Sequence, residues 1–115
     1  MRKSLSKSQR VVSGDEFTLI MRRGVCVADG VLVMFAVKSE DQQPRIGITI
    51  PKKAGNAVAR NRWKRLIRES YRIQQEQIPA GLNLVVRPKK GATPTWGSIQ
   101  KSVPKLARKA AQRLA

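Results

Sequence analysis

The segment 52–72 combines a high positive charge with the spacing of an amphipathic helix. It contains eight Lys or Arg residues and a single acid, Glu69. Asn56 is a favoured N-cap residue, and neither Gly nor Pro follows it until Pro79. The sequence therefore predicts a helix from about Asn56 to about Gln75.

The two sides of this predicted helix differ in chemistry. At about 100° per residue, Asn61 and Arg65 join a drifting stripe of four cations: Arg60, Lys64, Arg68 and Arg72. The side expected to pack against the rest of the protein carries Val58, Ala59, Trp63, Leu66 and Ile67. Solvated helix faces usually mix both signs of charge, because opposite charges four residues apart are stabilising. This stripe contains no acid, and a basic chain offers it no internal partner, so we predict a polyanion-binding helix.

The charge balance of the whole chain favours the same interpretation. Its 115 residues include 24 Lys or Arg and 7 Asp or Glu, for a formal charge of +17. Such a charge is favourable beside a phosphate backbone, because each neutralised phosphate releases counterions. An anionic membrane is the rival polyanion, but the sequence has no long apolar span and no lipidation motif. We therefore expect a nucleic-acid partner, no membrane and, at this length, one domain.

Residue types that support catalysis or metal binding are sparse. The chain has no His, and its adjacent acid pairs at 15–16 and 40–41 do not resemble a spaced carboxylate site. It also lacks a P-loop and a Gly-rich dinucleotide turn. We therefore expect no catalytic residue, no metal site and no small-molecule substrate.

Cysteine usage and the first residues bear on the compartment. Cys26 is the only cysteine, which excludes an intramolecular disulfide, and we interpret it as a small buried strand residue. Arg2 and Lys3 are not followed by the apolar stretch of a signal peptide. We therefore expect a cytoplasmic protein.

Local patterns predict the remaining elements. Residues 1–10 are expected to form a flexible basic arm and residues 11–115 a single domain. A capping box at 13–16 predicts a first helix that ends at Gly24, and Pro104 predicts a kink or restart near Ser102 in a last helix over 95–115. Alternation and turn residues predict four strands, with a hairpin turn at 29–30: 25–28, 31–37, 45–50 and 82–87.

This order of elements indicates an α+β fold. One helix, three strands, a helix, a strand and a helix can form a two-layer α/β sandwich. We expect a four-stranded sheet that three helices cover mainly on one side.

The block 52–69 closely resembles the signature of the protein subunit of bacterial ribonuclease P. The core of the resemblance is Arg60-Asn61-Arg62, followed by Lys64-Arg65 and Arg68, and the surrounding Gly, Asn, Ala and Val positions match as well. The resemblance extends over most of the chain, including segments 15–17, 45–50 and 82–88 and the helix end at Gly24.

This resemblance implies a function that composition cannot supply. Members of the family join a large catalytic RNA to form the endoribonuclease that removes 5′ leaders from precursor tRNA. The RNA positions Mg²⁺ and performs the hydrolysis, while the protein binds the RNA and contacts the single-stranded leader in a cleft on the sheet. The family fold also implies a left-handed β–α–β crossover, whereas the general rule predicts a right-handed one.

The resemblance assigns roles to particular residues. It implies RNA contacts by the signature helix and the turn before it, with a hydrated metal site near Asn61: Lys52, Lys53, Arg60, Asn61, Arg62, Lys64, Arg65, Arg68 and Arg72. Arg62 lies off the main stripe, so a structural role toward Glu69 is its alternative. Trp63 is expected to pack between helix and sheet, with stacking on RNA as the alternative.

The leader cleft would use aromatic side chains. Phe17 and Phe35 match aromatic positions of the cleft, and Met21 stands where an aromatic is common. Stacking on such rings tolerates any base, as variable leaders require. Ordinary core packing is the alternative for Phe17 and Phe35. A small ribosomal or nucleoid protein remains the alternative function, and an enzyme in its own right is disfavoured by the missing His.

Overall fold

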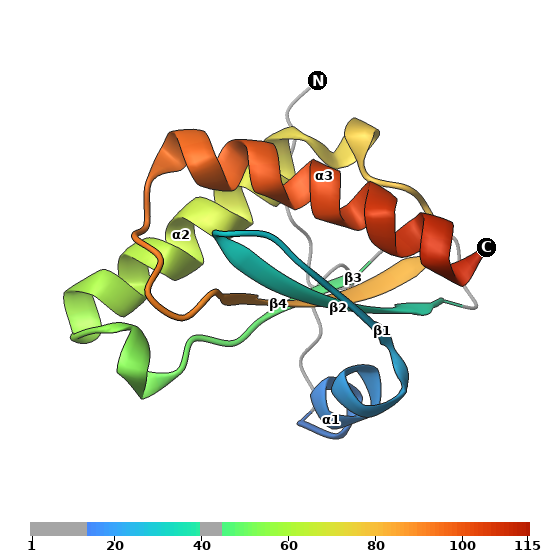
Figure 1. Ribbon diagram of the computed structural model, residues 1–115, viewed down its shortest axis with the longest axis horizontal. Helices are drawn as coiled ribbons and strands as arrows, with labels where there is room; N and C mark the ends of the chain where they lie inside the picture. Colours follow the sequence, from blue (N-terminus) through green and yellow to red (C-terminus); the bar gives the residue numbers. More distant parts are fainter. Residues whose placement is uncertain (1–13, 40–44) are drawn as a thin grey trace.

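The computed structural model describes residues 14–39 and 45–115, and Figure 1 shows their arrangement. The predicted order of helices and strands is confirmed: α1 (Gly14–Arg23), β1 (Val25–Ala28), β2 (Leu32–Lys38), β3 (Arg45–Ile48), the short helix η2 (Lys52–Ala54), α2 (Ala57–Ile73), the short helix η3 (Gln75–Gln77), β4 (Leu82–Pro88) and α3 (Trp96–Leu114). The arm expected at 1–10 and the start of the capping box at Ser13 lie outside the described residues.

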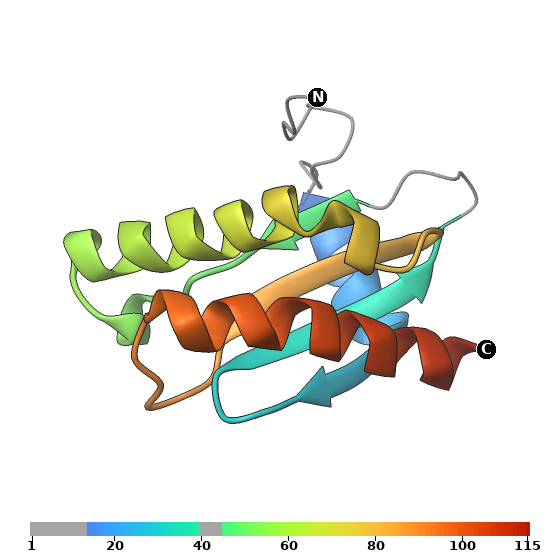
Figure 2. The same ribbon diagram turned by 90° about the horizontal axis from the view of Figure 1, so that it is seen from above.

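The four strands form one mixed sheet in the order β1-β2-β4-β3. β2 pairs antiparallel with β1 and β4, and β3 pairs parallel with β4, with Ile46 opposite Leu84. In Figure 2, α2 lies in front of the sheet, both parallel strands run from right to left, and β4 lies below β3. The β3–α2–β4 crossover is therefore left-handed, as the family resemblance implied and against the general rule.

The main core lies between the sheet and the two long helices. α2 and α3 lie side by side over one face of the sheet (Figures 1 and 2). Their buried side chains meet those of β2 and β4, and the largest are Trp63, Tyr71, Leu32, Met34, Ile67, Leu84, Ile99 and Leu106. Removing this apolar surface from water is the main stabilisation of such a fold, at about 25 cal/mol per Å².

Trp63 is only 1% exposed, which confirms the packing interpretation of this side chain and excludes its ring from stacking on RNA in this conformation. Val58, by contrast, was expected to pack but is 77% exposed. It lies in the first turn of α2, about 140° around the helix from Trp63, and so points away from the side that Trp63 packs.

α1 covers part of the opposite sheet face. There Ile20 and Val85 are buried, and Phe17, Met21, Phe35 and Val37 pack around them. α1 ends as predicted at Gly24, whose N–H donates to the Ile20 carbonyl over 2.9 Å. A Cβ at position 24 would lie 2.5 Å from that oxygen, so the close approach requires glycine.

Cys26, expected to be buried, is exposed. It pairs with Phe35 across the β1–β2 ladder and so shares the sheet face that α1 covers only in part. Because β1 is an edge strand, no further strand shields this position.

α3 is one helix from Trp96 to Leu114, with Pro104 inside it. Of the kink or restart predicted near Ser102, the restart therefore does not occur. Proline has no N–H for the carbonyl four residues earlier, which here belongs to Gln100. The side-chain amide of Gln74 donates to that carbonyl over 3.0 Å. A partner from another helix thus replaces the missing bond.

Candidate nucleic-acid interface

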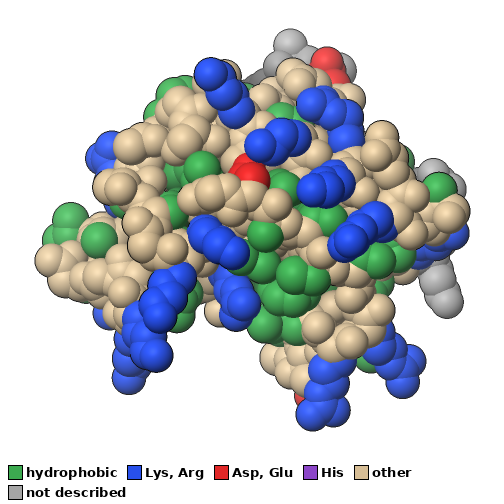
Figure 3. Space-filling view, viewed as in Figure 1, with side chains coloured by type: hydrophobic (Ala, Val, Ile, Leu, Met, Phe, Trp, Pro, Cys, Tyr) green, Lys and Arg blue, Asp and Glu red, His purple; other side chains and the backbone are tan. Residues whose placement is uncertain are grey.

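The exposed side of α2 carries most of the predicted RNA-binding residues. The N-cap prediction is confirmed, because Asn56 Oδ1 accepts the N–H of Ala59 over 2.9 Å. The helix exposes Asn61, Arg62, Lys64, Arg65 and Arg68 to solvent. Lys52 and Lys53 are exposed in η2, directly before the helix. Lys and Arg also dominate the charged side chains on the face of the molecule in Figure 3.

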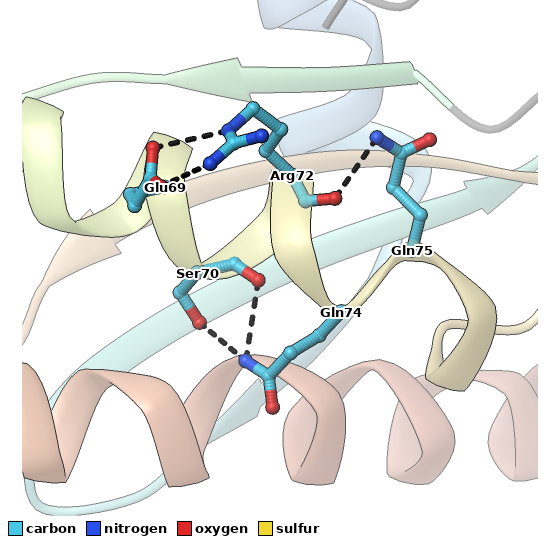
Figure 4. Close-up of polar contacts among 5 residues, drawn as sticks. All are labelled: Glu69, Ser70, Arg72, Gln74 and Gln75. Carbon is cyan, nitrogen blue, oxygen red and sulfur yellow. Dashed lines mark hydrogen bonds and ion pairs between the residues drawn. The ribbon is translucent and has the colours of Figure 1, made fainter. Parts of the chain in front are cut away.

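Arg72 differs from the other cations of the stripe because it is paired. Two hydrogen bonds join its guanidinium to the Glu69 carboxylate, one of them from Nε to Oε2 over 3.1 Å (Figure 4). This contact with Arg72 holds the pKa of Glu69 below its usual value. The expectation that the stripe has no internal acidic partner is therefore wrong at Arg72, because residues three apart on a helix are neighbours.

Arg62 lies off the stripe as predicted, but its hydrogen-bond partner is not Glu69. Its Nε donates to the carbonyl of Pro94 over 3.1 Å, which ties α2 to the loop before α3. A structural role for Arg62 is therefore supported, but its partner is the Pro94 carbonyl and not Glu69. The remaining donors of its guanidinium stay at the surface, because Arg62 as a whole is exposed.

Arg60 lies at the edge of the packed side of α2 and is half-buried. Its Nε is buried and, within residues 14–39 and 45–115, finds no hydrogen-bond acceptor. A buried donor without an acceptor costs free energy, so this nitrogen is a local source of instability.

A hollow of 430 Å³ opens at the end of the sheet, between η2 and the loop that follows β4. Val33 and Trp63 supply apolar walls, and four cations also line it: Lys53, Arg87, Lys89 and Lys90. Sequence reasoning did not assign Arg87, Lys89 or Lys90 to a site. One sequence feature could have placed Arg87. It lies two residues after Val85, which is buried, and alternate residues of a strand share a face of the sheet.

Phe17, Met21 and Phe35, the residues assigned to a leader cleft, lie together in the α1 cluster, and each is half-buried. The guanidinium carbon of Arg87 lies 5.4 Å from the centre of the Phe35 ring, which is a cation–π distance. Arg87 thus contacts this cluster through Phe35 and also lines the hollow.

Metal-binding groups and membrane-spanning helices were also sought among the residues that the structure describes. Residues 14–39 and 45–115 contain no group of three or more His, Cys, Asp or Glu placed to hold a metal ion. Across the same residues, no helix has both the length and the apolar character needed to cross a membrane.

Comparisons with known proteins agree with this arrangement. The model of the family Ribonuclease P matches residues 5–111. A ribonuclease P protein component of Brevibacillus brevis is 41% identical over 83 residues, which cover 71% of this chain and 66% of that protein. One from Clostridium novyi is 36% identical over 109 residues, which cover 92% of this chain and 96% of that protein.

A solved structure extends the likeness to three dimensions. The RNase P protein of Staphylococcus aureus superposes with a TM-score of 0.79 at 31% identity, covering 95% of this chain and 100% of that one. A three-helix, four-stranded α+β fold is thus common to both proteins. The chain therefore belongs to the ribonuclease P protein family, and this membership implies a role in an endoribonuclease complex that processes the 5′ ends of tRNA.

Proposed function

We propose that this chain is the RNA-binding subunit of a ribonuclease P, and that it assists a catalytic RNA in removing the 5′ leader from precursor tRNA. The observation that carries the proposal is the exposed side of α2. Lys64, Arg65 and Arg68 are exposed there, and no acid within residues 14–39 and 45–115 is paired with them. A capped helix packed through Trp63 holds these charges in place before RNA arrives.

Binding to the catalytic RNA would use phosphate contacts along α2 and η2. Arg presents a planar fork of donors that matches phosphate oxygens, and each neutralised phosphate releases counterions. Arg60 is only half-buried, so its guanidinium could add a phosphate contact at the edge of this surface. Arg72 contributes less net charge, because Glu69 already neutralises part of it.

Binding to the leader would use the other face of the sheet. Phe17, Met21 and Phe35 offer apolar and aromatic surface that can stack on a base of any identity, at about 1–3 kcal/mol per base. Arg87 joins this surface to the hollow with its further cations, so a single strand could stack at one end and place phosphates at the other. Such contacts tolerate the varied sequences of leaders.

Mg²⁺ is assigned in this proposal mainly to the RNA subunit. Mg²⁺ prefers carboxylate, phosphate and water oxygens. The described residues do not gather the acids that a protein-held ion would need, so their donor set does not fit a resident Mg²⁺ site. The chain itself would supply no catalytic residue; it would bind and position RNA. This function would place it in the cytoplasm, with precursor tRNA.

Multiple-turnover cleavage of a precursor tRNA at near-physiological salt and low Mg²⁺ tests the proposal. Three samples are compared: the cognate catalytic RNA alone, the protein alone, and both together. We expect substantial cleavage only in the mixture. If the mixture shows no gain while the RNA alone is active at high Mg²⁺, the chain is a general nucleic-acid binder instead.

A further inference from the structure

α3 carries a second row of cations, separate from the stripe on α2. Lys101, Lys105, Arg108 and Lys109 are exposed. At about 100° and 1.5 Å per residue, they occupy an arc of roughly 100° and a length of about 12 Å. The other side of α3 is buried in the main core through residues that include Ile99, Val103, Leu106 and Ala110. Figure 3 shows Lys and Arg side chains gathered over this helix.

The fold does not account for this row. α3 contains no acidic residue. Like charges three or four residues apart destabilise a helix, and Lys105 has three such neighbours in Lys101, Arg108 and Lys109. The helix dipole favours cations only near the last turn, where Arg113 lies, so it does not explain Lys101 or Lys105.

Among residues 14–39 and 45–115, one acid contacts the row. Asp29 Oδ2 lies 3.2 Å from Lys105 Nζ, and it also accepts a hydrogen bond from Ser102 over 2.6 Å. Within the described ranges, Lys101, Arg108 and Lys109 have no acidic partner. Asp29 therefore anchors α3 to the β1–β2 turn but leaves most of the positive charge of the row uncompensated.

The row lies on a different side of the molecule from the α1 cluster that contains Phe17, Met21 and Phe35. α2 and α3 lie side by side on one face of the sheet, whereas α1 and its aromatic cluster lie on the other (Figures 1 and 2). A ligand on the outer surface of α3 would therefore lie on the same side of the molecule as α2 and would not compete for Phe17 or Phe35.

We propose that Lys101, Lys105, Arg108 and Lys109 form a second binding surface, for the phosphate backbone of a structured RNA. The inference rests on the proposed function, because that function supplies the RNA. Three of the four residues are Lys, which act as point charges toward phosphates. The surface is therefore suited to positioning a backbone rather than to reading bases. Two RNAs share this chemistry, the catalytic RNA and the body of the precursor.

The test uses a triple variant with a matched control. Lys101→Gln, Arg108→Gln and Lys109→Gln are combined, and Lys105 is kept because of its contact with Asp29. The control combines Arg22→Gln, Arg23→Gln and Lys38→Gln, which removes the same charge from exposed positions outside the α2–α3 layer. Circular dichroism and thermal unfolding establish that both variants fold. The affinity of each full-length protein is measured against salt for the catalytic RNA, and the affinity of each reconstituted complex for precursor tRNA.

We expect the slope of log K against log salt to fall, relative to the control, by about 0.7–0.9 for each phosphate that the variant no longer neutralises. If the slope falls when the protein binds the catalytic RNA, the surface is assigned to that RNA. If the slope falls only when the reconstituted complex binds precursor tRNA, the surface is assigned to the precursor. Slopes equal to those of the control with both RNAs would overturn the proposal. Failure of the proposed function itself is distinguishable, because the unaltered protein would then not stimulate leader cleavage.

Discussion

The side-chain amide of Gln74 donates to the main-chain carbonyl of Gln100 over 3.0 Å, across the interface between α2 and α3. In an uninterrupted helix that carbonyl would accept a hydrogen bond from the N–H of residue 104, but Pro104 has no N–H to donate. Gln74 is itself buried and held in place, because Nε2 also donates to Ser70 Oγ over 2.7 Å (Figure 4). The end of α2 thus supports the middle of α3.

Gln74→Leu should lower the free energy of unfolding by about 1 kcal/mol, because it leaves the partly buried carbonyl of Gln100 without this donor. In a Pro104→Ala background the N–H of residue 104 can serve that carbonyl, so the same change should cost less. Urea unfolding of the four proteins forms a double-mutant cycle. An equal cost in both backgrounds would show that Gln74 acts through packing alone.

Combined neutralisation of Arg60, Lys64 and Arg68 should weaken binding to the catalytic RNA and flatten its salt dependence. The slope of log K against log salt should fall by about 0.7–0.9 per phosphate released from the interface. Arg72→Gln provides the comparison, because Glu69 already compensates its charge, and it should change the slope less than Lys64→Gln. An unchanged slope in the triple variant would mean that this side of α2 does not face phosphate.

Phe17→Ala should weaken binding of leader-bearing precursor more than binding of mature tRNA, by about 1–3 kcal/mol if one base stacks on the ring. The measurement compares both ligands with the reconstituted complex. Ile20→Val is the matched control, because Ile20 is buried in the same cluster but offers no aromatic face. Equal losses for precursor and mature tRNA would assign Phe17 to the core alone.

Asp29 should make stability depend on pH in the acid range. Burial alone would raise its pKa, but hydrogen bonds from Ser102 and from the N–H groups of Leu32 and Val31 outweigh burial and hold the pKa below its usual value. A lowered pKa in the folded state contributes stability above the unfolded value of about 3.9, and this contribution is lost as pH falls through the folded pKa.

Asp29→Asn should therefore reduce the loss of stability that begins near pH 5 and continues as pH falls past about 3.9 and through the lower folded pKa. Chemical unfolding at several pH values measures the effect. Glu16→Gln removes a half-buried carboxylate near Arg45 and controls for the general change in charge. A pH dependence that is the same in the Asp29→Asn variant as in the unaltered protein would contradict the assignment.

Features with local causes were predictable from sequence. The Asn56 cap, the burial of Trp63 and Ile67 and the end of α1 at Gly24 each follow from a residue type at a fixed helical spacing. The grouping of Phe17, Met21 and Phe35, by contrast, could not be predicted from local spacing. It came from the family resemblance, because these residues are separated in sequence and meet only through the pairing of the sheet with α1.

Charge, the order of elements and the exposed basic side of α2 were predictable, because they depend on composition and on periods of two to four residues. Local patterns did not predict the exposure of Cys26, the continuity of α3 through Pro104 or the place of Arg87 over Phe35, and only the family resemblance implied the left-handed crossover. Each of these depends on which distant segments meet. A local pattern specifies which side of an element packs, but it does not specify the partner that it packs against.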